Sequence, residues 1–312
     1  MTIIINHNNL LINKILFFFL FKYQVLCDTR LFIMFIFSAR GPSPSRQPYK
    51  IEQDIFCFHH QVDLKLDDRD FMFYVVMMDD GRIVSSIMNN KSPGPMLYIF
   101  NINGPLEYMI PVRYNSHGIT AIDNSTVAVT ACNSIDMYDI NNRVHLKSIV
   151  LSGIEFDTYF CGMYKITTIN NNLVVGKDNG IVIIDHQTGD VVKTIDTNGT
   201  CTWCVHGTSD KIFYCGNKVN NIYCYNYSDD KIDIMTLPSR PWSITSLQDG
   251  SVYVACVNGS VQHVSSDCKS YKTVTTEGLA PLEKPSVMSY NPKQGKLVIC
   301  SPKGMVKVFD EV

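Results

Sequence analysis

The sequence of 312 residues lacks the short motifs that mark common catalytic folds. It has no Gly-x-Ser-x-Gly elbow, no Walker motif and no His-Glu-x-x-His helix. These motifs are signatures of α/β-hydrolases, P-loop nucleotide-binding proteins and zinc proteases. The sequence therefore offers no catalytic residue on the basis of a motif.

Charge of either sign is sparse, at 18% of the residues, and the formal net charge is −2. Residues 1–48 carry five basic side chains and the single acid Asp28, which leaves a charge of −6 on residues 49–312. Nucleic-acid binding draws much of its affinity from basic side chains that displace counterions. The negative charge of residues 49–312 argues against a nucleic-acid partner.

A long uncharged apolar run is also missing. Residues 10–37 are strongly apolar, but the uncharged stretches Ile15–Phe21 and Leu31–Ala39 fall short of the ~20 residues that cross a bilayer as a helix. Three interpretations of residues 1–48 stay open: an extension outside the fold, a secretory signal, or a membrane anchor. We expect an apolar extension ending in the linker "GPSPSRQP" (41–48). A membrane partner or a secreted protein is expected only if residues 1–40 are a genuine signal.

The eleven cysteines do not form a disulfide framework, because their number is odd and the chain is long enough to bury a core. Cys215, Cys256 and Cys300 lie inside apolar strand-like runs, where a free thiol acts as a small buried hydrophobe. The composition indicates a reducing compartment, so we expect a cytoplasmic protein.

A short β pattern returns six times. Its first apolar anchors are separated by 44, 46, 39, 40 and 45 residues, and they are Ile83, Val127, Leu173, Ile212, Val252 and Leu297. A second apolar column follows each anchor by 8 to 14 residues, and a short polar residue follows that column by four. A period of ~40 to 50 residues made of short strands is typical of a β-propeller. We predict an all-β, six-bladed β-propeller over residues 49–312.

The sixth repeat has only three strands before the chain ends at Val312. A missing outer strand would leave unpaired backbone groups at a sheet edge. The segment "YKIEQDIFCFHHQVDLKL" (49–66) alternates like a strand, so we predict that it completes the sixth blade.

The blade sequences resemble the C-terminal NHL-like propeller of invertebrate, mollusc-type tripartite-motif-like proteins. The resemblance rests on residues 117–149, 178–195, 247–256 and 278–310, and it spans nearly all of 49–312. Members of that family usually carry a RING, B-boxes and a coiled coil ahead of the propeller. Only Cys27 precedes residue 49 here, so no RING can be formed from that segment. The resemblance implies the substrate-binding propeller of a ubiquitin-ligase-like protein, and we expect a non-catalytic protein-recognition scaffold without a cofactor. The alternatives are a lactonase-like metal-dependent hydrolase and an RNA-binding NHL-type propeller.

Three features could suggest a metal site. Cys201 and Cys204 form "CTWC", but residues three apart on a strand face opposite sides, so we interpret these cysteines as structural. The adjacent His59 and His60 should point in opposite directions for the same reason. The polar column after the third strands matches turn chemistry better than a calcium centre, and it consists of Asn101, Asp139, Asp185, Asn226, Ser265 and Asp310. We expect no metal.

The segments that join one blade to the next should converge on one face and carry the partner-binding residues. Aromatic residues and Arg dominate protein-binding hot spots. The candidates on this rim are Arg113, Tyr114, His117, Tyr159, Tyr164, Trp203, Arg240 and Trp242. For the two tryptophans, packing between blades is an equally good interpretation.

Overall fold

The computed structural model describes residues 49–51, 55–64, 71–88, 94–113, 116–131, 134–151, 165–216, 218–279, 282 and 286–312. The chain divides into two units, residues 1–46 and 47–312, and the β-propeller occupies the second. Within the described ranges, all regular elements are strands, β1 to β24, and none is a helix that could cross a bilayer.

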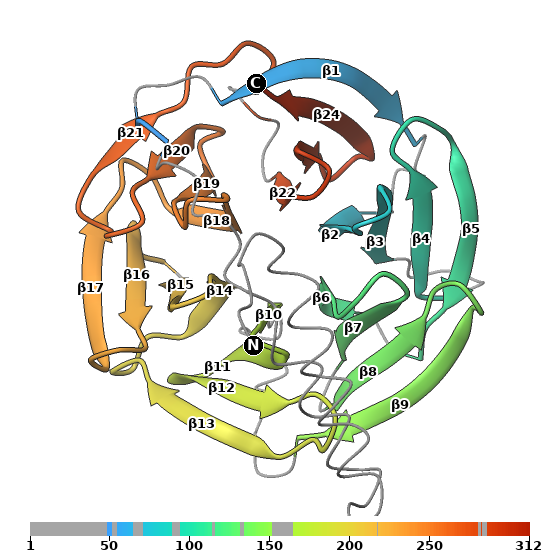
Figure 1. Ribbon diagram of the computed structural model, residues 1–312, viewed down its shortest axis with the longest axis horizontal. Helices are drawn as coiled ribbons and strands as arrows, with labels where there is room; N and C mark the ends of the chain where they lie inside the picture. Colours follow the sequence, from blue (N-terminus) through green and yellow to red (C-terminus); the bar gives the residue numbers. More distant parts are fainter. Residues whose placement is uncertain are drawn as a thin grey trace, which may run out of the picture. The chain divides into compact units, whose positions relative to one another are not determined.

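Six four-stranded antiparallel sheets form a ring around a central axis (Figure 1). The prediction of an all-β, six-bladed propeller is therefore confirmed. Each blade is given from its inner to its outer strand. Blades 1 and 2 consist of β2 (Phe71–Met77), β3 (Arg82–Met88), β4 (Met96–Asn101) and β5 (Leu106–Pro111), then β6 (Ser116–Ala121), β7 (Thr126–Ala131), β8 (Ser134–Asp139) and β9 (Val144–Val150).

Blades 3 and 4 consist of β10 (Ile166–Ile169), β11 (Asn172–Lys177), β12 (Gly180–Asp185) and β13 (Val191–Asp196), then β14 (Thr202–Gly207), β15 (Lys211–Gly216), β16 (Asn221–Asn226) and β17 (Lys231–Thr236). Blade 5 consists of β18 (Pro241–Ser246), β19 (Val252–Cys256), β20 (Val261–Val264) and β21 (Tyr271–Thr273). Blade 6 consists of β22 (Val287–Asn291), β23 (Lys296–Cys300), β24 (Met305–Glu311) and β1 (Phe56–Asp63).

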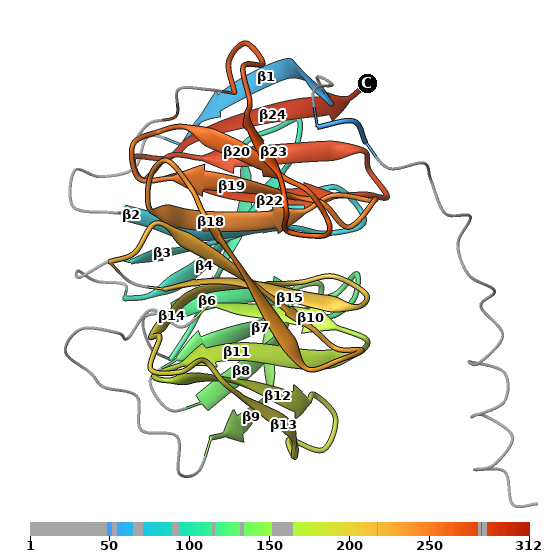
Figure 2. The ribbon, with the colours of Figure 1, turned by 90° about the vertical axis from the view of Figure 1, so that its left-hand side faces the viewer.

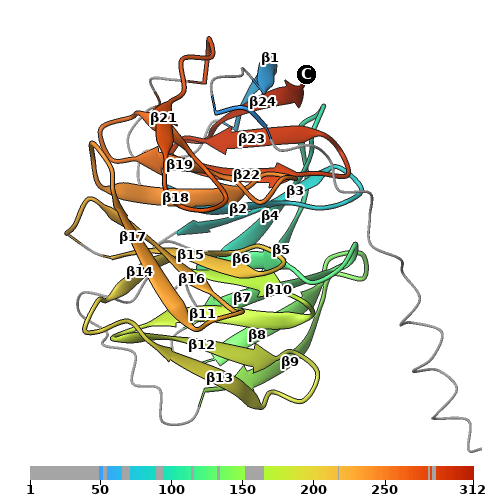
Figure 3. The ribbon, with the colours of Figure 1, turned by 60° about the vertical axis from the view of Figure 1, so that its left-hand side comes forward.

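The ring is closed by β1, which lies beside β24 in both side views (Figures 2 and 3). The two strands pair antiparallel from Phe56 opposite Glu311 to Asp63 opposite Met305. The prediction that the segment 49–66 supplies the missing outer strand is confirmed. Phe56 is 1% exposed and makes edge-to-face contacts with Tyr253 and Tyr290 at centroid distances of 5.6 and 5.4 Å. The closing strand thus joins the core between blades 5 and 6.

Burial follows the position of a strand in its blade. In β7, all six residues are buried, because adjacent blades cover both faces of the second strands. The outer strand β9 alternates between exposed positions and positions that are half-buried or, at Ile149, buried, since it borders solvent. This gradient explains why the second strands are almost continuously apolar in sequence.

Most of the polar column after the third strands forms turns. The exception is Asp310, which lies inside β24 and pairs with Lys296 and His59 instead. The Asp139 carboxylate accepts hydrogen bonds from the backbone N–H groups of Asn141 and Asn142 at 2.9 and 3.0 Å. Asp185 accepts in the same way from Gln187 and Thr188 at 2.7 and 3.1 Å, and these bonds lower the pKa of the Asp139 and Asp185 carboxyls. Because the third strands lie away from the axis, this column cannot assemble an axial metal centre.

Candidate functional site: the link face and the axial cavity

One side of the propeller, the link face, is formed by the segments that join blades and those that join second to third strands. Its described residues are 64, 94–95, 112–113, 151, 165, 178–179, 197–201, 218–220, 237–240, 257–260, 274–279, 282, 286 and 301–304. The opposite side, the turn face, consists of 78–81, 102–105, 122–125, 140–143, 170–171, 186–190, 208–210, 227–230, 247–251, 265–270 and 292–295.

The predicted rim residues differ in how far the structure describes them. Tyr114, Tyr159 and Tyr164 lie outside the described residues. His117 has a described backbone in β6, but its side chain is not described. Arg113, Trp203, Arg240 and Trp242 are described, and these four carry the geometry of the candidate site.

A β-bulge recurs at the start of the inner strands. The pairing with the second strand shifts by one residue at Phe73, His117, Trp203 and Trp242. A bulge leaves its extra residue outside the ladder and redirects its side chain. The two bulges in blades 4 and 5 therefore present the two tryptophans of the chain at neighbouring positions next to the link face.

Trp203 and Trp242 contact each other, with ring centroids 5.3 Å apart and ring planes tilted by 56°. Each ring also packs against a buried cluster between blades, and each remains half-buried. The buried Nε1 of Trp242 has no hydrogen-bond partner, which a tryptophan with a purely structural role normally finds. Packing between blades is thus observed for both residues, and part of each ring stays accessible.

The two arginines do not form one patch. Arg113 is exposed and precedes the inner strand of blade 2, whereas Arg240 is half-buried and precedes the inner strand of blade 5. In a ring of six blades these positions lie across the axis from each other (Figure 1). Arg240 adjoins the tryptophan pair in sequence, so a short bound segment at that pair reaches Arg240 before Arg113.

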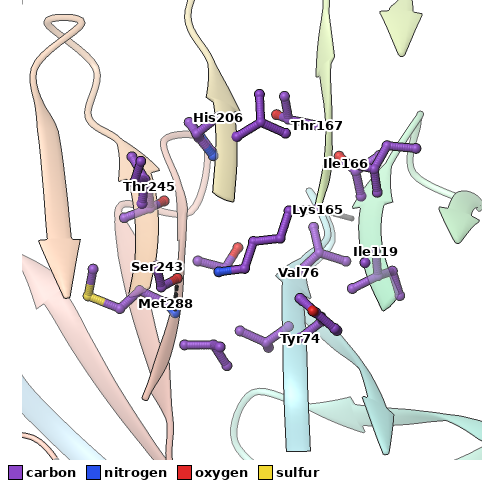
Figure 4. Close-up of a pocket in the computed structure, with 17 residues that line it drawn as sticks. Tyr74, Val76, Ile119, Lys165, Ile166, Thr167, His206, Ser243, Thr245 and Met288 are labelled. Carbon is purple, nitrogen blue, oxygen red and sulfur yellow. Dashed lines mark hydrogen bonds between the residues drawn. The ribbon is translucent and has the colours of Figure 1, made fainter. Parts of the chain in front are cut away.

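A cavity of about 80 Å³ lies on the axis and is lined by residues from all six inner strands (Figure 4). Lys165, the residue before β10, extends into it, and its Nζ donates a hydrogen bond of 2.6 Å to the Trp242 carbonyl oxygen. That carbonyl belongs to the bulged residue and therefore lies at a break in the sheet ladder. Lys165 thus links blade 3 to blade 5 across the cavity.

Lys165 was not among the sequence-predicted rim residues. Its charge marks it out among the equivalent residues of the six blades. By the strand-pairing registers, these residues are Lys165, Tyr74, Gly118, Cys204, Ser243 and Val287. Lys165 is the only charged residue of this set. The irregular start of the inner strands obscures this alignment when only the sequence is available.

Two neighbouring groups of the cavity are kept neutral. Burial and the Lys165 ammonium lower the pKa of His206 to about 4, while its Nε2 lies 3.0 Å from the Ser246 hydroxyl. Burial raises the pKa of the Tyr74 phenol above its ordinary value. No described residue that lines the cavity is a carboxylate.

The described residues of the two faces differ in charge. The described link-face segments carry the cations Arg113, Lys165, Lys218, Arg240 and Lys303 and the carboxylates of Asp178 and Glu277. The described turns of the other face carry an excess of aspartate, including Asp79, Asp80, Asp123, Asp229 and Asp230. Among the described residues of the link face, five cations therefore stand against two carboxylates.

The cysteines of "CTWC" point to different surroundings. The Cys201 thiol donates to the Asp178 carboxylate at 3.3 Å, whereas Cys204 is 1% exposed in the core between blades 4 and 5. Burial disfavours the Cys204 thiolate, but a hydrogen bond with Cys215 and the charge of Lys165 outweigh it and lower the pKa of Cys204. These contacts agree with the structural interpretation of both cysteines.

The expectation for His59 and His60 was wrong. A register shift between Phe58 and His60 breaks the alternation of β1, and the two imidazole rings contact each other at a centroid distance of 4.7 Å. His59 Nδ1 lies 2.8 Å from the Asp310 carboxylate, and His60 Nε2 lies 2.7 Å from the Ile102 carbonyl oxygen. In the described part of the chain, no group of three His, Cys, Asp or Glu side chains is arranged to hold a metal ion.

No protein-family model matches the sequence, and no curated protein sequence matches it. Solved β-propellers do match the fold. The structure of the Neurospora crassa Pan2 WD40 domain gives a TM-score of 0.57 at 9% identity, covering 82% of this chain and 95% of that one. U3-55K gives 0.59 at 10% identity, covering 81% of this chain and 83% of that one. The β-propeller domain of Cps50 (Swd1) from Myceliophteria thermophila gives 0.57 at 9% identity, covering 82% of this chain and all 100% of that one.

These likenesses show that the chain contains a β-propeller domain. At 9–10% identity they concern the fold alone. The resemblance of the blade sequences to NHL-like propellers of tripartite-motif-like proteins stays a prediction.

Proposed function

We propose that this β-propeller is a non-catalytic recognition module that binds a segment of a partner protein on its link face. The contact between Trp203 and Trp242 carries the proposal, because two half-buried indoles meet where the bulges of adjacent inner strands present them. Tryptophan and arginine are enriched at binding hot spots, and Arg240 directly precedes β18. The bound segment would cross the inner ends of blades 4 and 5.

The module would act by binding alone, with no bond made or broken by this chain. The blade sequences resemble the substrate-binding propeller of a tripartite-motif-like ubiquitin ligase, and we carry that role over as part of the proposal. We place the protein in the cytoplasm, a location supported by eight described cysteines that are all free thiols.

Selection of peptides tests this proposal. Dodecapeptides displayed on phage are selected on the wild-type chain, and dissociation constants are measured for the wild type, Arg240→Ala and Arg113→Ala. We expect Arg240→Ala to weaken binding by about tenfold, as truncation of a hot-spot residue does. Arg113→Ala is the matched control and should change affinity by less than about twofold, because its blade lies across the axis.

Three results would overturn the proposal. The first is a selection that enriches no peptide. The second is a single-stranded RNA oligonucleotide that binds where peptides do not. The third is a loss of peptide binding in Arg113→Ala alone. Selected peptides that bind Arg240→Ala and the wild type equally would move the site away from the tryptophan pair.

A further inference from the structure

Lys165 places its ammonium group at the axis, where the neighbouring Cys204 thiol also interacts with it. An ammonium group has three donors, and the Trp242 carbonyl oxygen accepts one of them. The Nζ atom also lies 5.8 Å from the centre of the Tyr74 ring, which attracts a cation but does not neutralise it. No ion pair joins Lys165 to a described carboxylate, and the side chain is half-buried rather than fully solvated.

The surroundings of Lys165 fit a small acidic group. A water-sized group needs about 10–15 Å³ of such space, so the cavity of about 80 Å³ has room for roughly five to eight of them. This is enough for a carboxylate with its methylene group. Hydroxyl groups of Thr167, Ser243, Thr245 and Ser289 also line the cavity.

Those hydroxyls already have a structural use. Ser243 accepts a hydrogen bond from the Met288 backbone N–H at 3.2 Å, and Thr245 accepts one from Tyr290 at 2.9 Å. Ser289 accepts one from Met77 at 3.0 Å, which ties blade 6 to blade 1. Each hydroxyl retains its own O–H for donation, so the wall can donate to an anion without breaking these links between blades.

We propose that the partner segment inserts an aspartate or glutamate side chain into the axial cavity, where the Lys165 ammonium receives its carboxylate. This inference rests on the proposed function and adds the chemistry of the partner. Among the described residues of the link face, cations outnumber carboxylates by five to two, which favours an acidic segment. The acidic group would also neutralise the Lys165 charge inside the cavity.

A purely structural role for Lys165 predicts a different result. If the lysine served only to satisfy the Trp242 carbonyl, its replacement would lower stability and would not change which peptides bind. The experiment must therefore measure a preference between ligands as well as the affinity of a variant.

Two dodecapeptide libraries provide that measurement, one with glutamate and one with glutamine fixed at the central position and with all other positions random. Both are selected on the full chain, and the enriched peptides are synthesised in matched glutamate and glutamine forms. Dissociation constants are measured for the wild type, Lys165→Met, Lys165→Arg and Lys272→Met. Lys272 is the control, because it lies on the exposed outer strand β21 and its replacement removes the same charge.

We expect the wild type to bind the glutamate form at least about tenfold more tightly than the glutamine form, as for a partly desolvated charge pair. Lys165→Met should reduce the preference to within about twofold, Lys165→Arg should keep part of it, and Lys272→Met should leave it unchanged. Equal binding of the two forms to the wild type would overturn the inference, and this comparison needs no variant to fold.

The failures of the two proposals are distinguishable. If peptides bind, depend on Arg240 and show no preference for glutamate, the acidic-ligand inference is wrong and the recognition surface stands. If neither library yields a binder, both proposals are wrong. A preference that survives in Lys165→Met with an unchanged melting temperature would assign the acidic group to another cation.

Discussion

The closing strand should contribute strongly to stability, and Phe56 offers the sharpest way to measure this. Phe56→Ala removes a ring that is 1% exposed and that contacts Tyr253 and Tyr290 across the core between blades 5 and 6. Phe58 lies on the same strand, is 48% exposed and makes one ring contact, with Phe309 at 5.7 Å. The two substitutions delete the same atoms from one strand in different surroundings.

Truncation of a fully buried phenylalanine costs about 3–5 kcal/mol of unfolding free energy, because the transfer of the ring and the remaining cavity both count. For the half-exposed Phe58, we expect about 1–2 kcal/mol on the same scale. A domain of this size loses about 2–4 °C in melting temperature per kcal/mol. Phe56→Ala should therefore melt about 6–20 °C below the wild type, and Phe58→Ala about 2–8 °C below it.

Thermal unfolding followed by tryptophan fluorescence is a suitable assay, since both tryptophans lie on the inner strands of blades 4 and 5, outside β1. A chain that begins at residue 67 provides the limiting case and should unfold or aggregate, because β24 would then be an open edge. The reasoning is refuted if Phe56→Ala melts together with the wild type, or if the two substitutions have equal effects.

Two further predictions concern the turns and the cavity. Asp139→Ala should lower the unfolding free energy by about 1 kcal/mol in urea denaturation, because two backbone N–H groups lose their acceptor. Asp139→Asn keeps an acceptor oxygen and should stay close to the wild type. Equal losses in both variants would contradict the turn interpretation. His206 has a pKa of about 4 in the folded protein against an ordinary value of 6.5, so the unfolded chain binds more protons between these values and stability should fall as the pH decreases from 6.5 to 4. His206→Gln should remove about 3 kcal/mol of that decrease, and parallel pH–stability curves for variant and wild type would count against this assignment.

Much of the architecture could be read from the sequence because each blade repeats a local pattern. The second strands are buried on both faces, so anchors such as Val127 and Ile212 must be apolar in every copy. Turn residues such as Asp139 and Asp185 recur because the same hairpin recurs. Even the closure by β1 followed from counting strands, since a propeller does not leave its last sheet incomplete.

The site could be predicted only in part. Arg113 and Arg240 lie on links between blades, as predicted, whereas Trp203 and Trp242 lie inside β14 and β18. The sequence could not show that Arg113 and Arg240 lie across the ring from each other. Nor could it show the contact between the tryptophans, which depends on bulges in two adjacent strands. The alternation rule failed at His59 and His60 for the same reason, because a bulge interrupts the period of two.

The sequence by itself determined the number of blades, the positions of their strands and the order in which the ring closes, since these depend on short-range patterns of apolar and turn residues. Only the tertiary structure decided that Lys165 of blade 3 meets the Trp242 carbonyl of blade 5 and that an axial cavity separates the inner strands. Those features join residues far apart in the chain, and they arise from bulges and from the curvature of the ring.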